Sequence, residues 1–202
     1  MRWLFTIALF ALITSFEHDD NAVLQHRFIV LPASQLVIDG KTNVNKFQCS
    51  ISRYSGTDTL VLQESGTKGK PIFIKGYVGL QASSFDCGMT AMTKDFTKTI
   101  KAKQHPQIGI DFKSFERLPN YGNAMDKFKG TLAISIAGIS HPFEMECTVE
   151  PNSNGIINLK GGRQFQFSDF ALTAPTKMLG AIKVDDKLEV HFHLVLQLDV
   201  NN

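Results

Sequence analysis

The C-terminal residues 187–200, KLEVHFHLVLQLDV, constrain the fold of this chain more than any other stretch. Apolar residues occupy every second position and polar residues fill most positions between them, with Val195 as the one exception. A period of two is typical of a β-strand with one buried face. At about 3.3 Å per residue the stretch spans roughly 40 Å, about twice a typical strand. Because strands of a parallel sheet are buried on both faces, this pattern predicts a tall antiparallel sheet or barrel.

The composition is that of a globular domain with an apolar interior. The chain has 202 residues, of which 43% are hydrophobic, a size typical of one domain. Its 21 Lys and Arg residues nearly balance 19 Asp and Glu residues, so it lacks the basic field of nucleic-acid-binding proteins. Sixteen Phe residues, against three Tyr and one Trp, supply apolar area without polar groups. This excess predicts an interior that is unusually apolar or unusually large.

The N-terminus, MRWLFTIALFALITSF, has one basic residue followed by an apolar run of about a dozen residues. The run is too short to cross a bilayer core of roughly 30 Å and is typical of a secretory signal peptide. Ile13 and Ser15 suit the positions before a cleavage site. We therefore expect a signal peptide over 1–15, an N-terminal arm over 16–26, one domain over 27–202, and no stable membrane span. An uncleaved N-terminal anchor is the alternative.

Short alternating segments separated by turn residues recur along the rest of the chain. We expect strands around residues 27–31, 36–38, 44–52, 71–80, 108–112, 130–138, 143–149, 165–167 and 187–200. One helix is expected over 88–102, because Met92, Phe96 and Ile100 recur at helical spacing, with Asp86 as its N-cap. About eight strands and one helix predict an all-β, closed antiparallel barrel, since closure removes the exposed edges of a sheet.

Four stretches resemble the YceI-like family of exported bacterial proteins. They are SQLVIDGKTNVNKFQC at 34–49, MTKDFTKTIKAKQHPQIGIDF at 92–112, KGTLAISIAGISHPFEM at 129–145, and FQFSDFALTAPTKMLGAIKVDDKLEVHFHLVL at 165–196. Their order and spacing carry the resemblance over nearly the whole mature chain. The resemblance implies an eight-stranded, lipocalin-like barrel with one α-helix near its opening, a periplasmic location, and a long isoprenoid chain held inside. GKTNVNKFQC departs from the commoner family opening, which leaves the identity of the lipid open.

An eight-stranded barrel is wide enough either to be filled by its side chains or to hold one slender ligand. Strands as long as 187–200 favour an elongated, narrow cavity suited to a linear lipid. By alternation, the candidate ligand-binding residues are Phe47, Ile108, Ile110, Phe112, Leu132, Ile134, Phe165, Phe167, Leu194 and Leu196. Ordinary core packing is the alternative for each. An interaction protein with a filled core and an enzyme for a hydrophobic substrate are the alternative functions, although the sequence shows no catalytic set.

The chain has three cysteines, and the sequence alone allows three pairings. Alternation places Cys49 and Cys147 on inward faces. We favour a disulfide between Cys49 and Cys87, which would tie the second strand to the start of the helix. We expect Cys147 to be buried among apolar neighbours, which raises its pKa and makes it unreactive.

Polar side chains suggest few further sites. His191 and His193 lie two residues apart on the outward face of 187–200, a spacing that can present two imidazoles to one metal. No third ligand is evident nearby, so we expect no metal and no cofactor. Lys94, Lys98 and Lys101 would meet a phosphate head group if the lipid carried one, and a solvated helix face is the alternative. Formation of a homodimer stays open.

Overall fold

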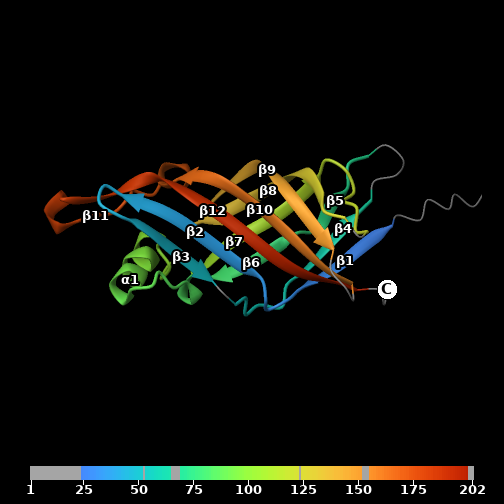
Figure 1. The fold of residues 1–202 in the computed structure, drawn as a ribbon, viewed down its shortest axis with the longest axis horizontal. Coiled ribbons are helices and arrows are strands. Elements are labelled where there is room, and N and C mark those ends of the chain that lie inside the picture. Colours follow the sequence, from blue (N-terminus) through green and yellow to red (C-terminus); the bar gives the residue numbers. More distant parts are fainter. Residues whose placement is uncertain (1–23, 52, 65–68, 123, 152–154, 200–202) are drawn as a thin grey trace, which may run out of the picture.

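The structure, a computed structural model, describes residues 24–51, 53–64, 69–122, 124–151 and 155–199. The expected signal peptide and most of the expected N-terminal arm lie outside the described residues. Strands dominate the described part, whose α-helix, α1, covers Thr90–Thr99 (Figure 1). No helix in these ranges has both the length and the apolar character that a bilayer span requires.

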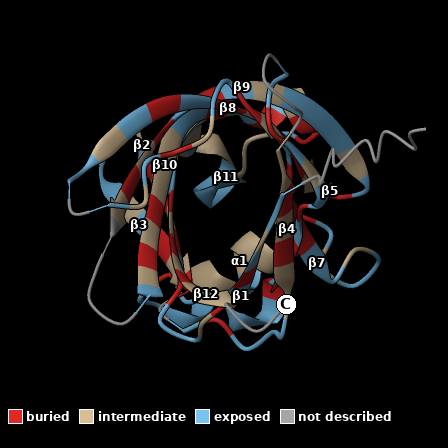
Figure 2. Ribbon diagram, turned by 90° about the vertical axis from the view of Figure 1, so that its right-hand side faces the viewer, coloured by how far each residue is buried: buried red, intermediate tan, exposed pale blue. Residues whose placement is uncertain are grey.

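Eight antiparallel strand segments form a closed barrel, seen end-on in Figure 2. Three of these segments each consist of two consecutive strands separated by a bend: β1 (Gln25–Val30) with β2 (Gln35–Thr42), β3 (Lys46–Ile51) with β4 (Thr59–Gln63), and β5 (Ile72–Lys75) with β6 (Tyr77–Gln81). The single strands are β7 (Gln107–Phe115), β8 (Asp126–Ile136), β9 (Ile139–Pro151), β10 (Ile156–Gln166) and β12 (Ile182–Asp199). The predicted eight-stranded antiparallel barrel with one α-helix is confirmed.

β12 closes the barrel because it bonds to strands from both ends of the chain. One edge pairs with β10, and the other pairs first with β2 and then, from Leu196 onward, with β1. The change of partner falls at Val195, whose N–H donates to the hydroxyl of Ser34 at 2.9 Å. The carbonyl of Val195 accepts the N–H of Leu31 at 2.8 Å. The residue that interrupts the sequence alternation thus marks the bend between β1 and β2.

The alternation predicted for the closing strand is present in β12. Phe192, Leu194 and Leu196 are buried, Leu188 and Val190 are half-buried against the core, and the intervening side chains are more exposed. β12 begins at Ile182, before the predicted start at 187, because its first residues pair with the short strand β11 (Thr176–Lys177). The predicted last residue, Val200, lies outside the described residues.

α1 is shorter than the predicted helix, and its predicted N-cap is wrong. The helix has Met89, not Asp86, at its N-cap position. Gly88 has a φ of 78°, which turns the chain just before the helix. The carboxylate of Asp86 therefore accepts the N–H of Gly88 at 2.9 Å instead of an N–H of the first helical turn. No residue of α1 is fully buried, although Met92 and Phe96 pack against the core.

The chain between β10 and β12 contains three short elements. The first is a 3-10 helix, η3 (Phe167–Phe170), which packs against the barrel end. β11 and a second 3-10 helix, η4 (Met178–Gly180), follow it. β11 and the start of β12 form a hairpin over 176–183 that extends beyond α1 at the left end of Figure 1.

Candidate functional site

An apolar cavity lies at the α1 end of the barrel, between α1, η3 and the inner faces of the strands. It encloses about 50 Å³. Five of the predicted ligand-binding residues line it, namely Ile108, Ile110, Ile134, Phe165 and Phe167. The other lining residues are Leu36, Ile38, Phe96, Ile100, Ile136, Met145, Gln166, Phe170, Leu172, Leu188, Val190 and Phe192. Gln166 is the single polar residue in this described lining, so the cavity suits an apolar chain.

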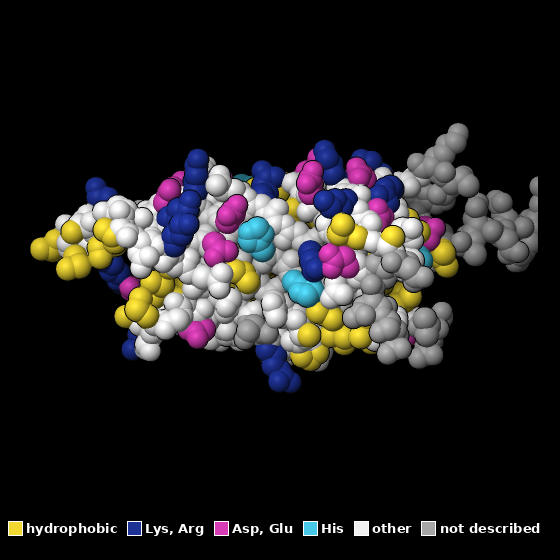
Figure 3. Space-filling model, in the orientation of Figure 1, with side chains coloured by type: hydrophobic (Ala, Val, Ile, Leu, Met, Phe, Trp, Pro, Cys, Tyr) yellow, Lys and Arg dark blue, Asp and Glu magenta, His cyan; other side chains and the backbone are white. Residues whose placement is uncertain are grey.

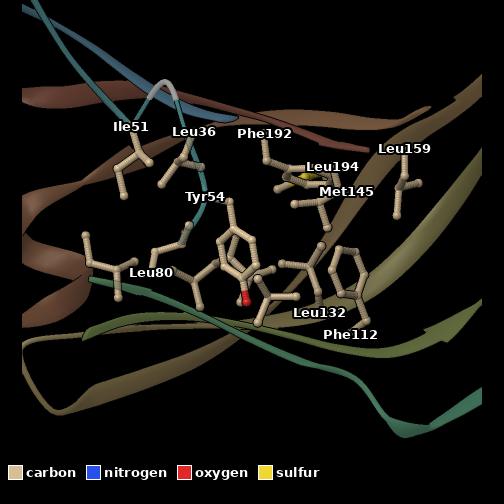
Figure 4. Packing of buried hydrophobic residues seen from close by; sticks show 14 of the residues in the cluster. Leu36, Ile51, Tyr54, Leu80, Phe112, Leu132, Met145, Leu159, Phe192 and Leu194 are labelled. Atoms are coloured by element: carbon tan, nitrogen blue, oxygen red, sulfur yellow. The ribbon is translucent and has the colours of Figure 1, made fainter. Parts of the chain in front are cut away.

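The other five predicted residues lie outside this cavity. Phe112, Leu132 and Leu194 are fully buried in the adjoining core (Figure 4). Leu196 faces a second void, of about 10 Å³, toward the other barrel end. Phe47 is half-buried and its ring crosses Gly40, where an added Cβ would lie 2.2 Å from the ring. As ligand contacts, all ten residues stay predictions.

A cluster of aromatic rings fills the barrel beyond the cavity. The ring of Phe112 meets that of Phe192 edge to face, with 5.7 Å between centroids (Figure 4). Phe73, Phe115 and Phe128 continue this packing at centroid distances of 4.6 to 5.5 Å. An eight-stranded barrel is narrow enough for facing side chains to meet across it. The elongated cavity expected from strand length is therefore reduced here to its α1 end, and the rest of the described interior is packed.

α1 and η3 together cover the cavity. Phe96 of α1 lines the cavity and its ring packs on that of Phe85 at 5.0 Å between centroids. Phe170 and Leu172, from η3 and the residues after it, form the opposite side of the cover. The sequence indicated the helical stripe that contains Phe96, but η3 lay in a segment without regular alternation.

The predicted disulfide between Cys49 and Cys87 is confirmed, and Cys147 is a buried free thiol. The disulfide lies where β3 and β6, among the described strands, share no ladder. Beside it, the backbones of Ser50 and Asp86 exchange two hydrogen bonds of 2.8 and 2.9 Å. These links join β3 to the chain that leads into α1, so they fix one end of the cover to the barrel wall.

A second discontinuity in the wall lies between β9 and β10. Their ladder ends where Gly161 pairs with Cys147. Beyond it, Arg163 donates to the carbonyl of Glu144 at 2.7 Å, and its guanidinium lies 4.9 Å from the centroid of the Phe143 ring. Phe143 in turn packs edge to face on Phe165, at 4.9 Å between centroids. Side chains, not a backbone ladder, therefore form this part of the cavity wall.

The histidine pair of β12 lies outside the barrel, as predicted. His191 is exposed, and Nε2 of His193 lies 2.8 Å from Oδ1 of Asn158. Partial burial and the nearby Lys160 ammonium lower the pKa of His193. Within the described ranges no group of three or more His, Cys, Asp or Glu side chains is placed to hold a metal ion. Lys94 and Lys98 are exposed on α1.

Solved structures of several bacterial proteins share this fold. BcnA from Burkholderia cenocepacia is 20% identical, with 80% of this chain and 95% of that chain covered and a TM-score of 0.58. A polyisoprenoid-binding domain from Saccharophagus degradans, implicated in plant cell wall breakdown, is 10% identical, with coverages of 85% and 98% and a TM-score of 0.59. The YCEI protein of Campylobacter jejuni is 17% identical, with coverages of 69% and 80% and a TM-score of 0.50.

The sequence itself identifies the family. No curated protein matches the chain. The model of the YceI-like domain, however, matches residues 29–196, which include all the described strands apart from residues 25–28 of β1 and 197–199 of β12. The chain belongs to the YceI-like family.

Proposed function

We propose that this protein binds the apolar chain of a long isoprenoid-type lipid, as a carrier or store. The cavity beneath α1 carries the proposal, because sixteen of its seventeen lining residues are apolar. Such a lining binds by non-directional burial, at about 0.8 kcal/mol per CH₂ group. The shared fold of a polyisoprenoid-binding domain supports the choice of an isoprenoid. Gln166, the polar side chain in the described lining, is neither a nucleophile nor a base, which favours binding over catalysis.

Export to the periplasm, or to another extracytoplasmic compartment, is part of this proposal. The apolar run near the N-terminus has the length of a signal peptide. The disulfide between Cys49 and Cys87 supports the same location, because disulfides persist in oxidising compartments.

The cavity must enlarge before a long lipid fits, and α1 is the element that we expect to move. None of the residues of α1 is fully buried. Lys177 and Asp95, an exposed pair 2.6 Å apart, join the helix to the 176–183 hairpin, and such a pair contributes about 1 kcal/mol or less. A few isoprene units bury enough carbon to offset both this contact and the cost of ordering the ligand.

Organic extraction of the purified protein followed by mass spectrometry tests the proposal directly. We expect an isoprenoid lipid in the extract, and we expect added polyprenyl phosphate to raise the melting temperature of delipidated protein. Phe96→Gln should weaken this binding by about tenfold or more, because it removes one large apolar contact. Met92→Gln is the matched control, since Met92 is half-buried on the same helix but does not line the cavity.

An extract without lipid, together with an unchanged melting temperature, would contradict lipid binding. That result would favour a second candidate, an interaction protein with a filled core. The aromatic packing around Phe112 and Phe192, which already fills much of the barrel, is the observation that favours this second candidate.

A further inference from the structure

The tip of the 176–183 hairpin exposes two adjacent apolar side chains. Met178 is 73% exposed and Leu179 is fully exposed. Apolar side chains gather at this end of the molecule in Figure 3, beyond α1 in the orientation of Figure 1. Single exposed apolar residues are normal on protein surfaces, but two adjacent ones on a protruding tip are available for contact with an apolar partner.

The backbone of this tip is held in an unfavourable conformation. Met178 and Leu179 have φ values of 50° and 56°, in the left-handed region that favours glycine or asparagine. Gly or Asn at either position would relieve this strain and reduce the exposed apolar area. Residues that keep such a conformation without gaining burial are found at functional surfaces.

Contacts on both sides hold the hairpin in place. On one side, the carboxylate of Asp95 in α1 accepts a hydrogen bond of 2.6 Å from the ammonium of Lys177. On the other side, Asn43 donates its backbone N–H to the carbonyl of Lys183 at 3.0 Å and its side-chain amide to the carbonyl of Ala181 at 2.9 Å. The tip is therefore a projection braced by the turn between β2 and β3, and the Lys177–Asp95 pair links it to α1.

The braces themselves expose further apolar side chains. Val44, in the turn between β2 and β3, is 68% exposed, and Met89, at the N-cap of α1, is 59% exposed. Four exposed apolar side chains thus belong to the hairpin and to the two segments that contact it at the same barrel end.

The same end of the barrel is basic. It consists of the segments 41–46, 86–106, 136–142 and 167–187, which carry nine lysines and five aspartates. The described residues outside these segments carry ten Lys and Arg residues against eleven Asp and Glu residues. Lys98, Lys101 and Lys177, together with Asp95, border a hollow of about 470 Å³ between α1 and residues 171–177. The positive charge is therefore concentrated around the apolar tip.

We propose that this end of the barrel docks on a bilayer that contains anionic lipids. Met178 and Leu179 would enter the boundary between head groups and acyl chains, while the surrounding lysines contact lipid phosphates. A buried apolar tip and a basic surround are the two contributions that bind peripheral proteins to such membranes. Docking in this orientation presents α1, the cover of the cavity, to the membrane surface. The docking itself does not require a lipid in the cavity.

Sedimentation with vesicles tests the proposal on the full mature protein. We expect binding to vesicles of equimolar phosphatidylcholine and phosphatidylglycerol, much weaker binding to phosphatidylcholine alone, and release by added salt. The uncharged double variant Met178→Gln/Leu179→Gln should bind these vesicles at least about tenfold more weakly than the unmodified protein. Its matched control is Leu24→Gln/Met125→Gln, which removes two other exposed apolar side chains from outside the basic end.

The charge contribution is tested in the same assay. Lys94→Gln/Lys98→Gln should weaken binding to the anionic vesicles by about tenfold, because each lysine near the surface contributes separately. The control Lys70→Gln/Lys75→Gln removes the same charge outside the basic end and should bind like the unmodified protein within about twofold.

Three outcomes would overturn the proposal. The first is no sedimentation with anionic vesicles. The second is an equal loss of vesicle affinity in the hairpin variant and in its control. The third is a protein that does not bind vesicles but forms a dimer, which the hairpin substitutions dissociate. Protein that contains no lipid on extraction but still binds vesicles through the hairpin would sustain this inference and contradict the proposed function. Protein that contains lipid but does not bind vesicles would support the proposed function and contradict this inference.

Discussion

At the scale of single residues, Cys147 shows how far alternation can predict a chemical property. The sequence placed its thiol on an inward face, and in the structure it is 1% exposed, close to where a Cβ on Gly130 would lie. Burial raises the pKa of Cys147 to about 12. The thiol therefore stays protonated in the folded protein at pH values where an unfolded chain would carry a thiolate.

This difference predicts a loss of stability at high pH that depends on Cys147. The contribution of the neutral thiol is fully present below its ordinary pKa near 9 and is lost as pH rises toward 12. Between about pH 8 and pH 10.5 we expect the unfolding free energy to fall by about 2 kcal/mol more than in Cys147→Ala. Urea denaturation at the two pH values measures this, and equal losses in both proteins would contradict it.

Alternation predicted which face each side chain occupies, but not what that face contacts. Ile134 and Leu132 share one face of β8, yet Ile134 lines the cavity and Leu132 lies in the packed core. The difference depends on how Phe112 and Phe192 meet across the barrel, which is a contact between strands far apart in the sequence. A pattern of period two carries no information about such a contact.

At the scale of elements, the disulfide joins the least regular part of the barrel wall. It bridges a sequence separation of 38 residues and links β3 to the chain before α1. Because β3 and β6 share no described ladder, few other covalent or hydrogen-bonded links hold this side of the cover. We therefore expect the bond to stabilise the whole domain and to restrain α1 in particular.

Replacing both cysteines tests this role. Cys49→Ala/Cys87→Ala should lower the unfolding free energy by about 4 kcal/mol, the value expected when a loop of this length is no longer closed in the unfolded chain. Amide exchange in α1 should accelerate more than in β8. Calorimetry measures the loss of stability, and hydrogen exchange measures the effect on α1. If the protein is destabilised but amide exchange in α1 is unchanged, the disulfide does not restrain the cover. Cys147→Ala serves as the control.

Elements with strong local signals were predictable, and elements without them were not. β12 and the residues of α1 repeat their periods over several turns or pairs. β4 has only five residues, and the adjacent Gly161 and Gly162 interrupt the alternation of β10. The prediction of Asp86 as the N-cap was wrong because Gly88, with its positive φ, inserts a turn before the helix, and a cap motif does not reveal such a turn.

At the scale of the whole molecule, the barrel has two unequal halves. The half next to α1 holds the apolar cavity, its cover of α1 and η3 and, among the described residues, the two places where neighbouring strands share no ladder. The other half is filled by aromatic and aliphatic side chains, of which Phe112, Leu132 and Leu159 are labelled in Figure 4. We expect ligand-dependent motion to be confined to the first half, since local opening follows low packing.

Hydrogen exchange with and without polyprenyl phosphate tests this division. Bound lipid should slow exchange in α1 and in residues 165–172, which cover the cavity, and should leave β4 and β5 unchanged. Phe96→Gln should reduce the protection at the same lipid concentration. Uniform protection along the chain, or protection confined to β4 and β5, would place the ligand elsewhere.

The position of β12 between β10 and the first strands also governs how the molecule is made. β1 and β2 are synthesised long before their shared ladder partner, the 18-residue strand at the C-terminal end of the described chain. Until that strand has left the ribosome, β1, β2 and β10 each keep an unpaired edge, and such non-local pairing is slow to form. The nascent chain therefore stays open until β12 has been synthesised, in a state that a chaperone or a translocation channel can accept.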